Sequence, residues 1–377
     1  MVYLGDIVRA VREAYLALRG TTPYQRKALR SIGRCRTEEM GLVRIRCERC
    51  RREHGLFRSC RNRHCPRCQA AAREAWLQAR ERELLPVPYF HVVFTVPEIL
   101  NPIALYCPEV FYAALLSAAG NALLDVGMSK LQARLGVLTI LHTWGQNLML
   151  HPHVHCVVPG GGFSPDGKRW IRVRKATYLL PVNVLRARFR TLLCQALRKA
   201  AERGDLARLP ADVLAHVTIE GAAAQRWVVY AKPPFGGPRQ VLQYLSRYTH
   251  RVAISNRRIV SFTGGKVTFV WRDYRDGNRM KASTIEAMEF VRRFLLHVLP
   301  DRFVRIRYFG FLTNARRGRN IERARELIGH TEPVIVRERP KFRVLCPECM
   351  AIVYGRNPDQ SPDPRTDRPP PFIEDAA

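Results

Sequence analysis

Hydrophobic and polar residues alternate along several short stretches of the chain, and this alternation predicts β-strands. Two hydrophobic runs within residues 259–271 flank the sequence Thr263-Gly264-Gly265. Such a glycine-containing link between two runs is typical of a hairpin turn. The other expected strands lie at residues 87–96, 135–144, 153–160 and 226–232.

Longer stretches carry hydrophobic residues three or four positions apart, which is typical of amphipathic helices. The expected helices lie at residues 1–20, 108–127, 182–204, 239–253 and 285–299. Strands with intervening helices and a hairpin predict an α+β fold, built on a mostly antiparallel sheet flanked by helices.

The pattern also divides the chain into three parts. Residues 1–80 hold clustered cysteines, residues 85–320 hold most of the expected strands and helices, and residues 321–377 form a C-terminal extension. From about residue 357 the extension is so proline-rich and polar that we expect disorder. We find no run of the roughly 18 hydrophobic residues that a membrane span needs. We therefore expect a soluble, cytoplasmic protein with no membrane partner.

Charge narrows the class of partner. The chain has 63 Lys and Arg residues against 32 Asp and Glu residues, a formal net charge of +31. Such an excess repels itself in a compact fold unless a polyanion is the usual partner. The composition therefore predicts nucleic-acid binding.

Six of the eleven cysteines lie between Cys35 and Cys68, which favours a metal site in a reducing compartment over disulfides. Four of the six form two Cys-x2-Cys pairs. Two such pairs can place four thiolates tetrahedrally around one structural Zn²⁺. The expected zinc ligands are Cys47, Cys50, Cys65 and Cys68.

Other cysteines and histidines leave alternatives open. Four nearby residues could form a second metal site or replace one of these ligands: Cys35, His54, Cys60 and His64. We favour the simpler interpretation, in which the cysteines are small buried side chains and the histidines are solvated imidazoles. Cys346-x2-Cys349 is half of a similar site and needs a second pair to complete it. Arginines between the cysteines, including Arg61 and Arg63, would be presented to phosphate by a zinc-pinned loop.

Three histidines, His151, His153 and His155, occupy alternate positions in one expected strand. Their side chains therefore share a face, about 6.5–7 Å apart. Burying several imidazoles without a metal or an anion is costly. Two interpretations compete: a histidine-triad site that processes nucleotides, and a pair, His153 and His155, that holds a divalent metal on a phosphodiester. Gly160–Gly162, which follow, suit either a close backbone approach or a tight turn.

Tyr244 and Tyr248 are four residues apart in a segment with helical spacing, so both hydroxyls share one face. They are either core aromatics or nucleophiles. A phenol has a pKa near ~10, so a nucleophilic tyrosine needs cationic neighbours or a polarised phosphate. The candidate cations, which are equally well explained as parts of a basic surface, are Lys232, Arg247 and Arg251.

Three stretches together, SCRNRHCPRCQ, HTWGQNLMLHPHVHCVVPGGG and YLSRYTHRVAISNRRI, resemble a known family. The chain is similar, from about residue 20 to 320, to the two-tyrosine rolling-circle transposases of the HUH nuclease superfamily. The resemblance is to the insertion-sequence kind with an N-terminal zinc-binding domain. It implies an HUH-type antiparallel sheet preceded by a small zinc-binding domain.

The resemblance also implies roles for individual residues. His153 and His155 match the two metal ligands of the family, with His151 as a neighbour. The third ligand varies in the superfamily; Gln146 is our choice and His142 the alternative. The nucleophiles match Tyr244 and Tyr248.

The implied activity is metal-dependent nicking and rejoining of single-stranded DNA at element ends, through 5′-phosphotyrosine intermediates and with Mg²⁺ or Mn²⁺. Structural zinc would help to recognise the ends. The implied partners are end and target DNA and host replication or helicase factors, at the nucleoid. The alternatives are a plasmid-type rolling-circle replication initiator or relaxase, and a non-catalytic zinc-dependent DNA-binding regulator.

Overall fold

The computed structural model of the protein describes residues 2–232, 240–241, 253–274, 276–329, 344–346, 348–349 and 352–353. The chain passes back and forth between two compact units. Unit 1 comprises Met1–Trp76, His250–Val298 and Arg337–Ala377, and unit 2 comprises Leu77–Thr249 and Leu299–Val336. The expected three-part division differs from this, because the hairpin near residues 259–271 and the chain after residue 337 both join unit 1.

Unit 2 is built on a seven-stranded sheet in which every described pairing is antiparallel. Its order is β7-β6-β4-β5-β3-β8, and β12 pairs with β4 beside β6. The expected α+β class with a mostly antiparallel sheet is therefore confirmed. The strands are β3 (Tyr89–Thr95), β4 (Arg134–Trp144), β5 (Leu150–Pro159), β6 (Gly161–Phe163), β7 (Trp170–Arg172), β8 (Val228–Lys232) and β12 (Ile306–Gly310).

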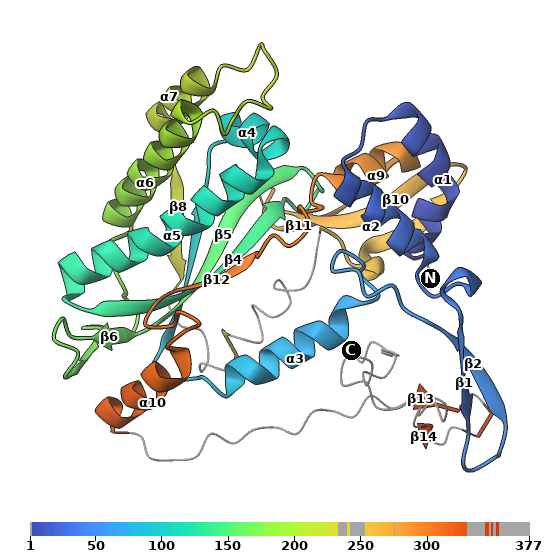
Figure 1. Ribbon diagram of the computed structural model, residues 1–377, viewed down its shortest axis with the longest axis horizontal. Helices are drawn as coiled ribbons and strands as arrows, with labels where there is room; N and C mark the ends of the chain where they lie inside the picture. The colour runs from blue at the N-terminus through green and yellow to red at the C-terminus, as the bar shows by residue number, and fades with distance from the viewer. Residues whose placement is uncertain are drawn as a thin grey trace. The chain divides into compact units, whose positions relative to one another are not determined.

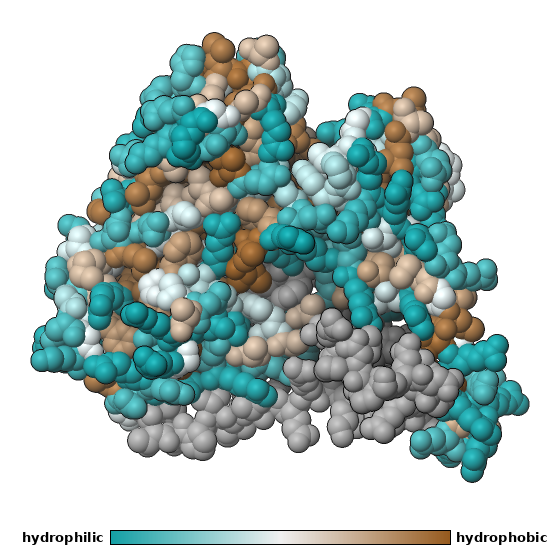
Figure 2. Space-filling model, in the orientation of Figure 1, coloured by the Kyte–Doolittle hydropathy of each residue, from teal (hydrophilic) through white to brown (hydrophobic). Residues whose placement is uncertain are grey.

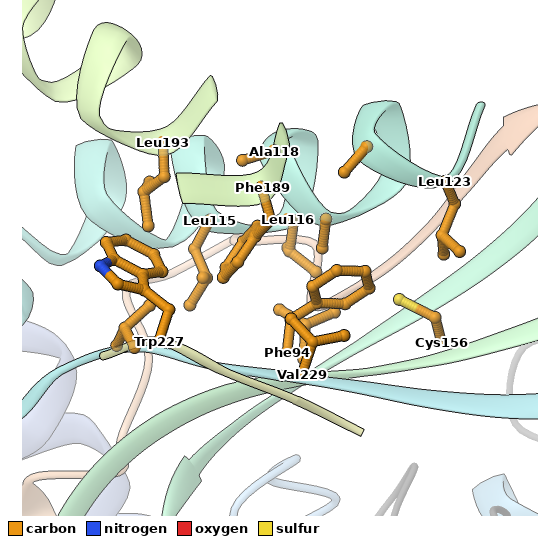
Figure 3. Packing of buried hydrophobic residues seen from close by; sticks show 14 of the residues in the cluster. Phe94, Leu115, Leu116, Ala118, Leu123, Cys156, Phe189, Leu193, Trp227 and Val229 are labelled. Atoms are coloured by element: carbon orange, nitrogen blue, oxygen red, sulfur yellow. The ribbon is translucent and has the colours of Figure 1, made fainter. Parts of the chain in front are cut away.

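Helices cover one face of this sheet (Figure 1). Figure 3 shows how Phe189 and Leu115, from two of these helices, point toward Phe94 and Val229 on the strands. Trp227 is fully buried in the same cluster. The helices of unit 2 are α4 (Asn101–Tyr106), α5 (Pro108–Leu131), α6 (Val182–Glu202), α7 (Ala215–Ala224) and α10 (Arg317–Ile328), with the short η2 (Glu98–Leu100).

Helix α5 bears on the expectation that the chain has no stretch hydrophobic enough to span a membrane. By length and composition it qualifies as a possible membrane span, with a mean hydropathy of 1.4 over an 18-residue window. In the structure, 61% of that window is buried, against β4, β5 and α6. Its hydrophobic residues are therefore accounted for by the core of unit 2.

Unit 1 consists of smaller pieces. Thr22 and Gln25 cap the start of α2 reciprocally: the backbone N–H of Gln25 donates to Thr22 Oγ1, and that of Thr22 to Gln25 Oε1. The helices are α1 (Leu4–Leu18), α2 (Pro23–Arg34) and α9 (Ala287–Leu295), with η1 (Glu38–Met40) and η3 (Asn256–Arg258). The strands form three separate small sheets: β1 (Leu42–Arg46) with β2 (Glu53–Phe57); β9 (Ile259–Thr263), β10 (Lys266–Asp273) and β11 (Arg279–Glu286); and β13 (Val344–Leu345) with β14 (Ile352–Val353). The division between the units falls inside α3 (Gln69–Glu81).

The glycines after β5 serve the sheet itself. A Cβ on Gly161 would lie 2.4 Å from the Ile171 carbonyl oxygen, and one on Gly162 would lie 2.4 Å from that of Arg134. Both residues are therefore explained by close strand packing.

Hydrophilic residues dominate the face seen in Figure 2, and hydrophobic residues form small separate patches. This agrees with the large excess of basic residues in the composition.

Candidate metal centres

The expected row of histidines lies on the face of the unit 2 sheet that points away from the helices. On β5, Val154, Cys156 and Val158 belong to the hydrophobic core. Because neighbouring residues of a strand point to opposite faces, His151, His153 and His155 all point the other way. The sequence pattern therefore placed the row on a single face, as expected.

A third imidazole joins His153 and His155. His142 on β4 is paired directly with His153, and its side chain is 2% exposed. One ligand nitrogen from each of the three residues lies within 4.8 Å of the other two. This histidine cluster (His142, His153, His155) has the spacing of a metal site.

Hydrogen bonds orient two of the three rings. His153 Nδ1 lies 2.7 Å from the His151 carbonyl oxygen, which can only accept, so Nδ1 carries the proton and Nε2 keeps a free lone pair. His155 Nδ1 lies 2.7 Å from Nε2 of His91, a buried residue on β3. Such hydrogen bonds to the second ring nitrogen fix the ring orientation of metal-binding histidines.

Burial keeps these imidazoles neutral. Desolvation lowers the pKa of His153 to about 4 and that of His91 to about 4. It also lowers the pKa of His155 well below its ordinary value. Neutral imidazole is the form that binds metal, so the cluster is ready for a cation at neutral pH.

The other residues expected near this site take different places. Gln146 lies in the turn between β4 and β5, after the strand that carries His142. Lys232 lies at the end of β8, paired with His91, so its side chain shares the histidine face. The sequence reasoning missed His91 and also Tyr230, which is 56% exposed and pairs with Val93 on the same face. The alternation within HVVFTV was the available signal for His91.

Tyr244, Tyr248, Arg247 and Arg251 lie outside the described residues. Their expected roles are therefore carried by the sequence.

The cysteines form two clusters in unit 1, where the sequence predicted one. Cys65 and Cys68 gather with Cys35 and Cys60, and Cys47 and Cys50 gather with the two cysteines near the end of the chain. The expectation that Cys47, Cys50, Cys65 and Cys68 share a single site is wrong. The reason is geometric: β1 and β2 carry the first Cys-x2-Cys pair on a hairpin away from the second pair.

We call Cys35, Cys60, Cys65 and Cys68 the first cysteine cluster. Its sulfur atoms are close: Cys35 Sγ lies 3.4 Å from that of Cys68 and 3.7 Å from that of Cys65. The favoured interpretation of Cys35 and Cys60 as ordinary side chains is therefore corrected. Hydrogen bonding from Cys60 lowers the pKa of the Cys35 thiol, which favours the thiolate that binds metal.

His64 stays apart from this cluster. Its backbone N–H donates to Asn62 Oδ1 at 2.9 Å, and its Nδ1 lies 3.2 Å from the same oxygen. Arg61 is exposed and Arg63 is half-buried in the loop between Cys60 and Cys65. This loop presents a basic side chain to solvent, as the sequence predicted for Arg61.

Comparisons with known proteins assign the cysteine-containing and histidine-containing parts of the chain to two different families. Residues 7–96 match the family described as "Transposase zinc-binding domain", and residues 136–319 match the one described as "Putative transposase". The first range contains the complete first cysteine cluster, and the second contains the complete histidine cluster. The two cysteine clusters, with the first match, support structural zinc.

Two curated relatives are similar along most of their length. The chain is 46% identical over 339 residues to "Putative transposase y4qJ" of Sinorhizobium fredii, covering 88% of this chain and 85% of that protein. It is 28% identical over 307 residues to the transposase for insertion sequence element IS801 of Pseudomonas savastanoi pv. phaseolicola, covering 79% and 73%.

Among solved structures, the conjugative relaxase TrwC in complex with oriT DNA is 14% identical, over 42% of this chain and 71% of that chain, with a TM-score of 0.22. A likeness this weak says nothing about the residues of the site. The two curated relatives and the two family matches decide the assignment, and the resemblance found in the sequence is confirmed at that level. The chain belongs to the IS91 family of insertion-sequence transposases.

Proposed function

We propose that this transposase nicks and rejoins single-stranded DNA at the ends of its element, through a covalent 5′-phosphotyrosine link. The observation that carries the proposal is the histidine cluster, in which one ring nitrogen each of His142, His153 and His155 lies within 4.8 Å of the others on the face of the sheet opposite the core. The transposase family supplies the biological setting.

The donor set fits a divalent transition metal. Three imidazole nitrogens suit Mn²⁺ better than Mg²⁺, which prefers oxygen ligands. We assign His142 as the third ligand in place of Gln146, because His142 contributes a nitrogen to the cluster. A bound divalent ion would withdraw charge from a non-bridging oxygen of the scissile phosphate.

The residues around the cluster have complementary tasks. The His91 ring and the His151 carbonyl fix the orientation of His155 and His153. Lys232 brings an ammonium to the same face, where it would neutralise phosphate charge. Tyr230 offers an exposed ring on which an unpaired base can stack.

Tyr244 or Tyr248 then acts as the nucleophile, by resemblance to the two-tyrosine family. The phenol gives up its proton as its oxygen bonds to phosphorus, the bond from phosphorus to the 3′-oxygen breaks, and that oxygen takes up a proton, so that no proton is gained or lost overall. The products are a 5′-phosphotyrosine and a free 3′-OH, so the phosphodiester energy is retained. A later 3′-OH can reverse the step and join strands without ATP. Arg247 and Arg251 are the nearby cations that the sequence offers to stabilise phenolate or phosphate.

The zinc-binding region would recognise the element ends. Its arginines, Arg61 and Arg63 among them, would contact phosphate, a sequence-independent contribution that weakens as salt rises. The remaining partners are target DNA and the host replication or helicase factors that expose single strands. The protein would act in the cytoplasm, at the nucleoid, where this DNA is found.

Two alternative functions make different demands. A plasmid-type initiator or relaxase would share the covalent chemistry, and it is distinguished by whether DNA flanked by matching ends moves in a cell. A non-catalytic DNA-binding regulator would have no use for the histidine cluster. The family assignment favours the transposase.

The covalent step is tested with a single-stranded oligonucleotide from an element end, incubated with the full-length protein and Mn²⁺. We expect an SDS-stable protein–DNA adduct, located by mass spectrometry at Tyr244 or Tyr248. The double variant Tyr244→Phe/Tyr248→Phe should form no adduct. An adduct that persists in the double variant would overturn the tyrosine assignment.

The metal assignment is tested with a matched pair of variants. His142→Ala should abolish cleavage and Mn²⁺ binding, whereas Gln146→Ala should retain Mn²⁺ binding. His216→Ala, at an exposed position of α7, is the control for removal of a histidine. Loss of Mn²⁺ binding in Gln146→Ala with retention in His142→Ala would reverse the assignment.

A further inference from the structure

We propose that unit 1 holds a second structural zinc ion, bound by two segments from opposite ends of the chain. The ligands of this second cysteine cluster are Cys47, Cys50, Cys346 and Cys349. Cys346 and Cys349 lie outside both ranges that match known families. The site would therefore make Cys346 and Cys349 part of the zinc-binding unit.

The sulfur positions fit one tetrahedral zinc. Cys47 Sγ lies 3.6 Å from Cys349 Sγ, and Cys50 Sγ lies 3.6 Å from Cys346 Sγ. Zinc–sulfur bonds of about 2.3 Å in a tetrahedron give sulfur–sulfur edges of about 3.8 Å. A disulfide would need about 2.05 Å, and all four cysteines are free. The first cysteine cluster, in the region matched as zinc-binding, has edges of 3.4 to 3.7 Å.

Two similar hairpins supply the ligands. Cys47 directly follows β1 and Cys346 directly follows β13, and in both cases the return strand begins three residues after the second cysteine. In the first hairpin the turn is tight: the backbone N–H of Arg51 donates to the Cys47 carbonyl at 2.8 Å, with φ at +62°. Each hairpin thus presents a Cys-x2-Cys pair at one end, as two halves of one tetrahedron require.

The surroundings suit a cluster of thiolates. His54 Nε2 lies 3.1 Å from Cys346 Sγ, close enough for the ring N–H to donate to a thiolate. Arg52 forms an ion pair with Glu348 at 2.9 Å across the same two segments. A Zn²⁺ ion with four thiolates carries a net charge of −2, which these neighbouring donors partly offset.

Among the described residues, the second hairpin has few protein contacts to hold it. Strands β13 and β14 have two residues each, and an isolated two-stranded hairpin is marginal in water. The buried hydrophobic cluster at this point consists of Ile45, Cys47 and Cys346. The Arg52–Glu348 pair is exposed, and such pairs contribute about 0–1 kcal/mol. A bound metal supplies the missing free energy, as in other small zinc-dependent folds.

Cysteine alkylation of the full-length protein tests the site, with mass spectrometry to assign each modified peptide. In the purified protein we expect Cys346 and Cys349 to resist iodoacetamide, and to react once a strong zinc chelator is added. In the variant Cys47→Ser/Cys50→Ser, Cys346 and Cys349 should react without a chelator, although Cys47 and Cys349 are 302 residues apart. Zinc content should fall by one equivalent per chain.

Two controls separate loss of this site from loss of folding. In Cys47→Ser/Cys50→Ser, Cys65 and Cys68 should stay protected, because they belong to the first cysteine cluster. In Cys35→Ser/Cys65→Ser, Cys346 and Cys349 should stay protected. Unchanged reactivity of Cys346 and Cys349 in Cys47→Ser/Cys50→Ser would overturn the proposal. Protection released by a thiol reductant instead of a chelator would indicate disulfides and would overturn it too.

Discussion

The two units of the molecule differ in the interactions that stabilise their folds. Unit 2 has a continuous hydrophobic core between a seven-stranded sheet and its helices. In the part of unit 1 that carries the second cysteine cluster, the described hydrophobic cluster is small and consists of Ile45 with Cys47 and Cys346. We therefore expect a metal ion to matter in different ways in the two units: it would stabilise the cysteine region, whereas the sheet of unit 2 positions the histidine cluster through its own hydrophobic core.

The largest expected effect that tests this comparison is removal of zinc. A strong chelator should expose the backbone around both cysteine clusters, because bound zinc is folding free energy in small metal-dependent regions. The β3–β5 core of unit 2 should keep its protection. Hydrogen–deuterium exchange read by mass spectrometry measures both regions in one sample, and added Zn²⁺ should restore the first. Equal loss of protection in β3–β5 would contradict the contrast.

A core substitution should show the reverse pattern. Phe94 is fully buried against Phe189, and Phe94→Ala should lower the free energy of unfolding by about 3–5 kcal/mol. Urea denaturation monitored on unit 2 measures the loss, while alkylation of Cys65 should be unchanged below the transition. Phe57→Ala, at a ring that is 39% exposed, is the control and should cost far less. Release of Cys65 in Phe94→Ala would show that the two regions are coupled.

The histidine site should respond in metal affinity and leave stability nearly unchanged. His91 touches His155 through one nitrogen, so His91→Phe keeps a ring but removes the hydrogen bond that orients a ligand. We expect Mn²⁺ affinity, measured by calorimetry, to fall about 10–100-fold. The variant His91→Asn, which offers a polar atom again, should recover part of the affinity. A large loss of stability with unchanged affinity would make His91 a core residue.

The smallest expected effect concerns an ion pair in unit 1. Hydrogen bonds from Arg292, followed by those from Arg293, lower the pKa of Glu289 to about 2. A lowered pKa contributes stability above the unfolded value, and that stability is lost as the pH falls toward the folded value. Because these side chains are partly exposed, Glu289→Gln should cost less than about 1 kcal/mol at pH 7.

Thermal unfolding of wild type and Glu289→Gln, compared from pH 8 to pH 3, checks the sign. The difference in stability should stay constant down to about pH 5, where the native and unfolded carboxyl are both largely ionised, and should shrink as the pH falls below the unfolded pKa of about 4.3. Glu13→Gln, at a side chain that is 78% exposed, should change little. A difference that shrinks between pH 8 and pH 6 would contradict the lowered pKa.

Local pattern predicted four of the seven strands of the unit 2 sheet and its two longest helices, α5 and α6. The expected strands at 87–96, 135–144, 153–160 and 226–232 correspond to β3, β4, β5 and β8, because alternation reports a face directly. The choice between His142 and Gln146 was harder, since it depends on the offset between β4 and β5. His142 pairs with His153 because of the register between β4 and β5, and this register cannot be read from a single sequence.

The cysteines show where such reasoning fails. Spacing correctly singled out each Cys-x2-Cys pair, yet nearness in the sequence suggested the wrong partners. Cys47 finds Cys349 because two short hairpins meet end to end, a contact that no local pattern encodes. The expected boundary between domains was affected in the same way, because residues 250–298 return to unit 1.

The wide separation of these ligands has a consequence for synthesis. During translation Cys47 and Cys50 are synthesised early, and all strands of the unit 2 sheet are synthesised before Cys346. Until then, the hairpin of β1 and β2 supplies only two of the four ligands of the second cysteine cluster. If the second cysteine cluster binds zinc as proposed, a polypeptide that stops before residue 346 would keep the histidine cluster but would lack two of the four zinc ligands.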